Sequence, residues 1–85
     1  MFLWYIHLER GVMTHHLTAI IEREGAGYVA LCSELDIASQ GDTIEEARKN
    51  LTEAVELFFE TASSKETAQR LHGEVYVTQF EVSCA

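Results

Sequence analysis

The histidines and cysteines are the residues in this sequence best suited to binding a metal or attacking a substrate, and their spacing fits neither use. The four histidines show no metal-ligand spacing: His7, His15, His16 and His72. His15 and His16 are adjacent in a predicted strand, where successive side chains point to opposite faces, so they cannot chelate one ion together. Cys32 lies in an apolar run, where a cysteine acts as a small hydrophobe, and Cys84 lies near the carboxyl end. We therefore expect no metal site, no cofactor and no catalytic cysteine.

The carboxylates are numerous, and most lie where a predicted helix would expose them to water. A catalytic carboxylate needs burial or a close partner to shift its pKa. We find no set of acidic residues on adjacent strands that could hold two Mg²⁺ ions, so we expect no enzymatic activity. On the predicted helix, the residue spacing instead places acidic side chains on one face, around one leucine. We call this set the acidic stripe: Glu46, Glu53, Glu56, Leu57 and Glu60.

The acidic stripe has two interpretations. The ordinary one is a solvated face that keeps the protein soluble. The other is a contact surface for a basic protein, with Leu57 as an apolar anchor amid charge. Glu56 and Glu60 lie in the last turns of the predicted helix, where negative charge interacts unfavourably with the helix dipole. A binding role would explain this small cost, so we treat the stripe as the candidate partner-binding site.

The composition excludes several classes of function. The 85 residues include 14 acidic and 6 basic side chains, which give a formal net charge of −8. Lys and Arg supply most of the affinity for nucleic acids and anionic membranes, so we expect neither as a direct partner. No apolar run approaches the roughly 18 residues that span a bilayer. Two cysteines without a signal peptide do not form a disulfide framework, so we expect a cytoplasmic protein.

Three strands are predicted ahead of the helix. Residues 16–23 alternate, with Leu17, Ala19 and Ile21 on one face. The glycines at 25 and 27 predict a hairpin connection between two strands. They do not predict a phosphate-binding loop, because no helix follows them directly. Residues 28–32 are continuously apolar, which predicts a strand buried on both faces. Residues 37–40 form a short third strand after a turn.

The predicted helix begins after Gly41-Asp42-Thr43, because Thr43 and Glu46, or Asp42 and Glu45, have the capping-box spacing. Apolar side chains recur on the arc that faces the sheet: Ile44, Ala47, Leu51, Ala54, Val55, Phe58 and Ala62. The helix should break at Ser63-Ser64, followed by a short helical turn through Leu71.

Residues 74–83 predict a fourth strand, with a bulge where the apolar phase shifts. The predicted fold class is therefore α+β, in the order β-β-β-α-β, with one helix packed on one face of the sheet. That helix leaves the second face uncovered although it also carries apolar side chains, so we expect a homodimer or a higher homo-oligomer.

Residues 1–12 differ from the rest of the chain and hold its only tryptophan. We weigh two interpretations equally. One is a leader that is not translated, with Met13 as the true start, because Glu-Arg-Gly-Val before a methionine is what ribosome-binding DNA often encodes. The other is an extra edge strand or a disordered tail. In either case residues 13–85 form a single domain.

Several short motifs carry a family resemblance: Gly27-Tyr28-Val29-Ala30, Ser39-Gln40-Gly41-Asp42-Thr43, Glu46-Ala47, Asn50 and Glu53-Ala54-Val55-Glu56-Leu57. Together they resemble the amino-terminal domain of HicB-family antitoxins over about residues 17–62. The resemblance implies a partial ribonuclease-H-like fold whose fourth strand runs parallel to the first. It also implies binding to a small basic HicA toxin, an mRNA interferase, whose RNA-cutting surface the antitoxin masks.

The chain departs from the family pattern in two places. Residues 33–38 replace the frequent Pro-x-Leu-Pro-Gly-Cys segment, and no helix-turn-helix or ribbon-helix-helix pattern follows the fourth strand. We therefore expect no operator binding by this chain. The function we favour is a module that masks a basic HicA-like toxin through the acidic stripe. Two alternatives stay open: an orphan HicB-like domain that only self-associates, and an enzyme such as a degenerate nuclease or a small-molecule hydrolase, for which the sequence names no catalytic carboxylate. Gly41, Asp42 and Thr43 are expected to shape the start of the helix and not to touch a partner.

Overall fold

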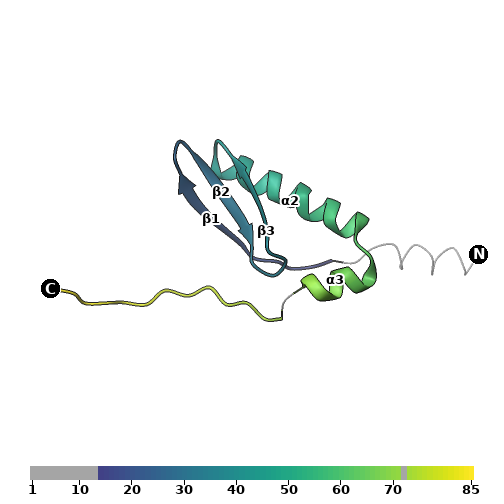
Figure 1. Cartoon of the computed structure of the whole chain (residues 1–85). Coiled ribbons are helices and arrows are strands. Elements are labelled where there is room, and N and C mark those ends of the chain that lie inside the picture. The colour runs from purple at the N-terminus through teal and green to yellow at the C-terminus, as the bar shows by residue number, and fades with distance from the viewer. Residues whose placement is uncertain (1–13, 72) are drawn as a thin grey trace, which may run out of the picture.

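The computed structural model describes residues 14–71 and 73–85, so the expectation for residues 1–12 falls outside the described residues (Figure 1). Its elements are β1 (Ala19–Glu24), β2 (Gly27–Cys32), β3 (Ile37–Gly41), α2 (Ile44–Thr61) and α3 (Ser64–Arg70). The strands form an antiparallel sheet in the order β1-β2-β3, and α2 lies across one face of it. This arrangement confirms the predicted α+β class and the order of three strands followed by a helix.

The connection between β1 and β2 is a two-residue hairpin loop. Glu24 pairs with Gly27, which leaves Gly25 and Ala26 between the strands. Gly25 has a φ of 59°. A positive φ at the first central position suits a type II′ turn, whose twist matches that of the flanking strands. The hairpin predicted from the glycines is confirmed.

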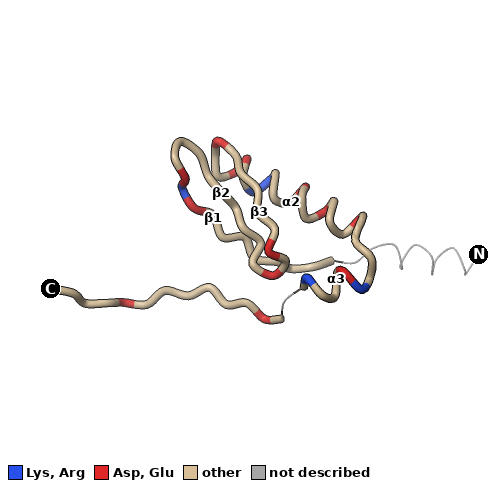
Figure 2. The backbone as a smooth tube through the Cα atoms, viewed as in Figure 1, with Lys and Arg blue, Asp and Glu red and all other residues tan. Residues whose placement is uncertain are grey.

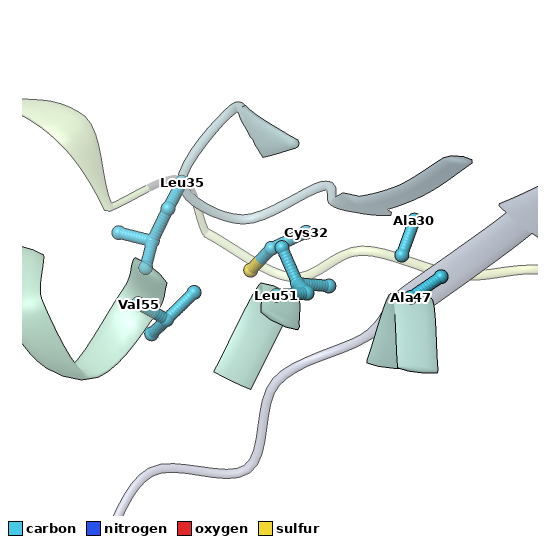
Figure 3. Packing of buried hydrophobic residues seen from close by; sticks show 6 residues of the cluster. All are labelled: Ala30, Cys32, Leu35, Ala47, Leu51 and Val55. Atoms are coloured by element: carbon cyan, nitrogen blue, oxygen red, sulfur yellow. The ribbon is translucent and has the colours of Figure 1, made fainter. Parts of the chain in front are cut away.

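The core lies between the sheet and α2 and is built from six buried residues: Ala30, Cys32, Leu35, Ala47, Leu51 and Val55. Figure 3 shows Ala30 facing Ala47, and Leu35 facing Val55. Small side chains at the first of these contacts let the helix approach the sheet closely. The apolar arc predicted for the helix is confirmed at its centre, whereas Ile44 in the first turn is 48% exposed.

The start of α2 is fixed by a capping box. The Thr43 hydroxyl accepts a hydrogen bond from the Glu46 backbone N–H at 3.0 Å. The Glu46 carboxylate in turn accepts from the Asp42 backbone N–H at 2.6 Å. Of the two spacings in the sequence, the structure therefore forms the one between Thr43 and Glu46, which satisfies two backbone donors at the helix end.

The short helix α3 is anchored to the turn between β2 and β3. Ser63 caps its start, as the sequence predicts, by accepting from the Glu66 backbone N–H at 3.1 Å. The Arg70 guanidinium donates from Nε and Nη2 to the Leu35 carbonyl at 3.2 and 2.7 Å. It also lies over the Phe58 ring, 5.5 Å from the centroid. These contacts fix α3 against the turn between β2 and β3 and against the last turns of α2.

The expected fourth strand is not formed within the described chain. Residues 73–85 contain no strand and run away from the sheet, so the pairing of residues 74–83 with β1 is not made (Figure 1). A strand exists only where its backbone N–H and C=O groups meet those of a neighbour, and this segment has no such neighbour among residues 14–71. Its large apolar side chains are therefore exposed to water, at 65% for Val77 and 84% for Phe80.

No described helix or strand covers the second face of the sheet either. Ala30 and Cys32 point toward α2, so Val29 and Leu31 point to the opposite face, where Ile20 lies across from Leu31. Leu31 is 37% exposed, and Ile20 and Val29 are half-buried. The prediction that β2 is buried on both faces is therefore not met by a single chain.

Candidate protein-interaction site

The acidic stripe lies on the side of α2 that faces away from the sheet. Its five residues are all exposed, and Leu57 keeps 59% of its surface in water. Figure 2 shows the acidic positions as red bands along the helix. The second half of α2, residues 51–61, contains three glutamates and neither lysine nor arginine. The acidic character of the stripe is therefore concentrated toward the carboxyl end of the helix.

Glu46 differs from the rest of the stripe in its position on the helix and in its hydrogen bonding. Its carboxylate is already bonded to the Asp42 backbone N–H in the capping box. Lys49 lies on the same side of the helix, three residues after Glu46 and four before Glu53, and places a positive charge between them. Glu46 thus has a structural use that the other candidate residues lack. We call those other residues, Glu53, Glu56, Leu57 and Glu60, the distal patch.

The distal patch is a compact group, because each member is three or four residues from two others. Residues at these spacings are neighbours on a helix surface, so Leu57 is flanked by Glu53 and Glu60. The helix rises about 1.5 Å per residue, so Glu53 and Glu60 are about 10 Å apart along its axis. Like charges at these spacings repel, and no basic residue lies in the last turn to offset the helix dipole. The patch therefore costs the helix stability.

A hollow of about 420 Å³ borders the distal patch, between α2 and the segment that leads into β1. Glu56 and Arg48 line it together with apolar residues that include Leu51, Val55 and Phe59. The His15 ring stacks on Phe59 at 4.6 Å between centroids, with 9° between the planes. The sequence did not predict this hollow, because its two walls, residues 14–19 and 48–59, are at least 29 residues apart in the chain.

Cys32 lines the same hollow but is not prepared for nucleophilic attack. Burial raises the pKa of its thiol, so the sulfur stays protonated at neutral pH. The thiol lies 3.7 Å from the Glu34 carboxylate, toward which it can donate. The thiol therefore behaves as part of the core.

A second unpredicted feature is a clamp between Thr18 and Glu34. The Glu34 carboxylate accepts from the Thr18 backbone N–H at 2.9 and 3.1 Å and from the Thr18 hydroxyl at 2.7 Å. Partial burial pushes the pKa of Glu34 upward, but the hydrogen bonds from Thr18 outweigh it and hold the pKa below its ordinary value. The clamp ties the start of β1 to the turn between β2 and β3.

Across residues 14–71 and 73–85, no three histidine, cysteine or acidic side chains gather closely enough to hold a metal ion. In the same part of the chain, no helix is both long and apolar enough to cross a membrane.

Comparison with known proteins places the chain in a family. No family model matches the sequence, and no solved structure matches it. It is 47% identical over 49 residues to the UPF0150 protein ssr1765 of Synechocystis sp., a match that covers 55% of this chain and 62% of the relative. It is 50% identical over 50 residues to the UPF0150 protein ssl0738 of the same organism, covering 56% of this chain and 69% of that relative. The chain therefore spans less than two thirds of the first relative and slightly more than two thirds of the second. At this level of identity and coverage, the chain belongs to the UPF0150 family.

Proposed function

We propose that this protein is an antitoxin-type interaction module that binds a small basic HicA-like mRNA interferase and masks its RNA-cutting surface. The resemblance of the sequence to HicB antitoxins supplies the class of partner. The observation that supports the proposal most is the distal patch, where three exposed glutamates surround an exposed leucine on one face of α2.

The mechanism is occlusion by charge and shape. An enzyme that cuts RNA must present basic side chains where the phosphates lie. The carboxylates of Glu53, Glu56 and Glu60 would take the place of these phosphates, while Leu57 would bury its exposed surface against the partner. Opposite potentials on the two surfaces accelerate association and exclude like-charged partners. Leu57 would supply the apolar anchor that holds the complex once it is formed.

The cost of the distal patch also supports a binding role. Three like charges near the carboxyl end of a helix are unfavourable by a few tenths of a kcal/mol for each contact. In a complex with a basic partner, the electrostatic energy of these glutamates would become favourable, because the positive charges of the partner would neutralise them.

The experiment is a co-purification in which the charge of the patch is reversed. Tagged chains carrying Glu53→Lys and Glu60→Lys together would be compared with the unchanged protein. A matched control carries Glu24→Lys and Glu45→Lys, which changes the net charge equally, from −8 to −4, at exposed positions outside the patch. We expect the patch variant to lose the basic partner and the control to retain it. Equal retention by both variants, or equal loss from both, would contradict recognition by the distal patch.

A second function is supported by a different observation. The uncovered sheet face and the exposed carboxyl-terminal segment favour an orphan HicB-like domain that only self-associates. Recovery of a homo-oligomer without any other protein from the native cells would support this second function over the first.

A further inference from the structure

We propose that the carboxyl-terminal segment Glu74–Ala85, which we call the tail, pairs as a strand with the outer edge of β1 in a second copy of this chain. Two copies would thus exchange tails. The proposal rests on the exposed side chains of the tail, on the open edge of β1 and on the hollow beneath α2. It differs from the toxin-binding proposal in its partner, a second copy of the chain, although the hollow that the tail would fill borders the distal patch at Glu56.

The tail has the alternating side-chain pattern of a β-strand, although it pairs with none of the described strands. In an extended segment alternate residues share a face, so Tyr76, Phe80 and Val82 lie in one row with Thr78 between them. The three are 79%, 84% and 75% exposed. Aromatic and β-branched residues at this spacing are typical of a half-buried strand. An exposed apolar row of this kind in a folded protein marks a surface that is covered by a partner.

Of the two edges of the sheet, β1 is the one that can accept another strand. On β3, the Gln40 carbonyl is already occupied by the Asn50 side-chain amide of α2, at 2.8 Å. The turn leading into β3 is occupied as well, since Arg70 donates to the Leu35 and Asp36 carbonyls. Among the described residues, no side chain from α2 or α3 donates to a carbonyl of β1. A free edge of this kind is a template for strand addition.

The hollow beside β1 is the place where the apolar row of an added strand would fit. It opens between α2 and the start of β1, and its lining includes Ala19 from β1 and Leu51, Val55 and Phe59 from α2. A strand added along β1 directs alternate side chains toward the helix side of the sheet. Phe80 and its neighbours in the row would then fill the hollow and complete the layer of apolar contacts below α2.

A second copy is the occupant that the geometry favours. Gly73 and the first residues of the tail, as far as Tyr76, border the residues that lead into β1, and from there the tail runs away from its own sheet (Figure 1). Residues 74–83 extend about 33 Å at 3.3 Å per residue, which is enough to follow the whole of β1. Because both copies carry the same tail and the same edge, a two-fold axis satisfies both at once and closes the dimer.

The first test measures the oligomeric state of the full chain by native mass spectrometry and light scattering. We expect a dimer of twice the 9.6 kDa chain mass. Phe80→Asp should weaken dimerisation at least 100-fold, because it puts a charge into the hollow. The matched control is Gln79→Asp, which adds the same charge to the opposite face of the tail and should leave the dimer intact. A monomer of the unchanged chain at 100 μM, or a dimer that survives Phe80→Asp, would overturn the proposal.

The second test distinguishes exchange between copies from a return of the tail to its own sheet. All chains carry Cys84→Ser, and Cys32 is buried. One chain carries Glu22→Cys on β1, and the other carries Gln79→Cys in the tail. We expect a short bismaleimide to join the two different chains covalently, and a partner with Glu45→Cys in place of Glu22→Cys to give no such product. A chain that carries both the Glu22→Cys and Gln79→Cys changes and links only within itself would refute the exchange.

Discussion

Gly41 offers a quantitative test of how α2 is seated on the sheet. It ends β3 immediately before the capping box, and the first turn of the helix lies directly against it. A Cβ atom added at this position would lie 2.5 Å from the Ala47 backbone nitrogen and 2.8 Å from the Glu46 carbonyl carbon. Real Cβ atoms do not approach other heavy atoms so closely, so Gly41→Ala must push the helix away from the strand.

The expected cost follows from the kind of atoms that must move. Overpacking a well-packed site usually costs about 1–3 kcal/mol. At Gly41 the obstructing atoms belong mostly to the backbone and cannot rotate away, so we expect about 3 kcal/mol, the upper end of that range. A domain of this size has a free energy of unfolding of about 4–13 kcal/mol, so the variant should be clearly less stable.

Urea unfolding followed by circular dichroism measures this cost, and Gly25→Ala is the matched control. Gly25 has open space around the added Cβ, so its substitution is opposed only by its φ of 59°. That backbone conformation costs an alanine about 1–2 kcal/mol. Gly41→Ala should therefore be the more destabilising of the two glycine substitutions. A smaller loss for Gly41→Ala than for Gly25→Ala would refute the close approach of helix and strand.

Three further predictions concern the charges and clamps of the fold. Glu53→Lys with Glu60→Lys should raise the free energy of unfolding by about 0.5 kcal/mol at low salt. The change removes the repulsion of Glu56 by both glutamates and the unfavourable helix-dipole contact, and these gains are partly offset by the loss of the Lys49–Glu53 attraction. Urea titrations should show the gain shrinking in 1 M NaCl. The pKa of Glu34 is lowered in the folded state, so the stability that its carboxylate contributes is present above the ordinary pKa of 4.5 and is lost as the pH falls through the folded-state pKa. Thr18→Val should therefore destabilise the fold by about 1 kcal/mol at pH 6, and urea titrations at successively lower pH should show this loss shrinking as Glu34 becomes protonated. A loss that stays the same at every pH would contradict the clamp. Arg70→Lys cannot reproduce two parallel donations, so amide hydrogen exchange in α3 should accelerate several-fold while exchange in the centre of α2 stays unchanged.

The sequence predicted the elements whose signals are local. The hairpin at Gly25 and the capped starts of α2 and α3 depend on residues within a few positions of one another, and all three are confirmed. The order of three strands and a helix follows from periodicity in the same way. Interactions between distant residues gave no such signal. Thr18 and Glu34 are 16 positions apart, and Arg70 and Leu35 are 35 apart.

The tail shows where a local pattern is insufficient. Its β-branched and aromatic residues predict a strand, but a strand also needs a neighbour, and no periodicity states whether that neighbour belongs to the same chain. The structure shows the pattern without the pairing.

The candidate site was predicted in outline, because a spacing of three and four residues fixes which side chains share a helix face. The capping role of Glu46 could have been predicted from the sequence. Its spacing from Thr43 already indicated a capping box, and a carboxylate that accepts from the backbone is less available to a partner. The hollow next to Glu56 could not be predicted, because the packing of residues 14–19 against α2 creates it.

The most direct test of the proposed function is RNA cleavage by the captured partner. The tagged chain, at its native level of expression, would be used to isolate bound proteins, and any small basic protein recovered would be freed and assayed on RNA. We predict that adding the chain stops cleavage at an equimolar ratio, and that the variant carrying Glu53→Lys and Glu60→Lys does not. Recovery of the chain with no basic protein, or cleavage that continues unchanged in the presence of excess chain, would contradict the masking function.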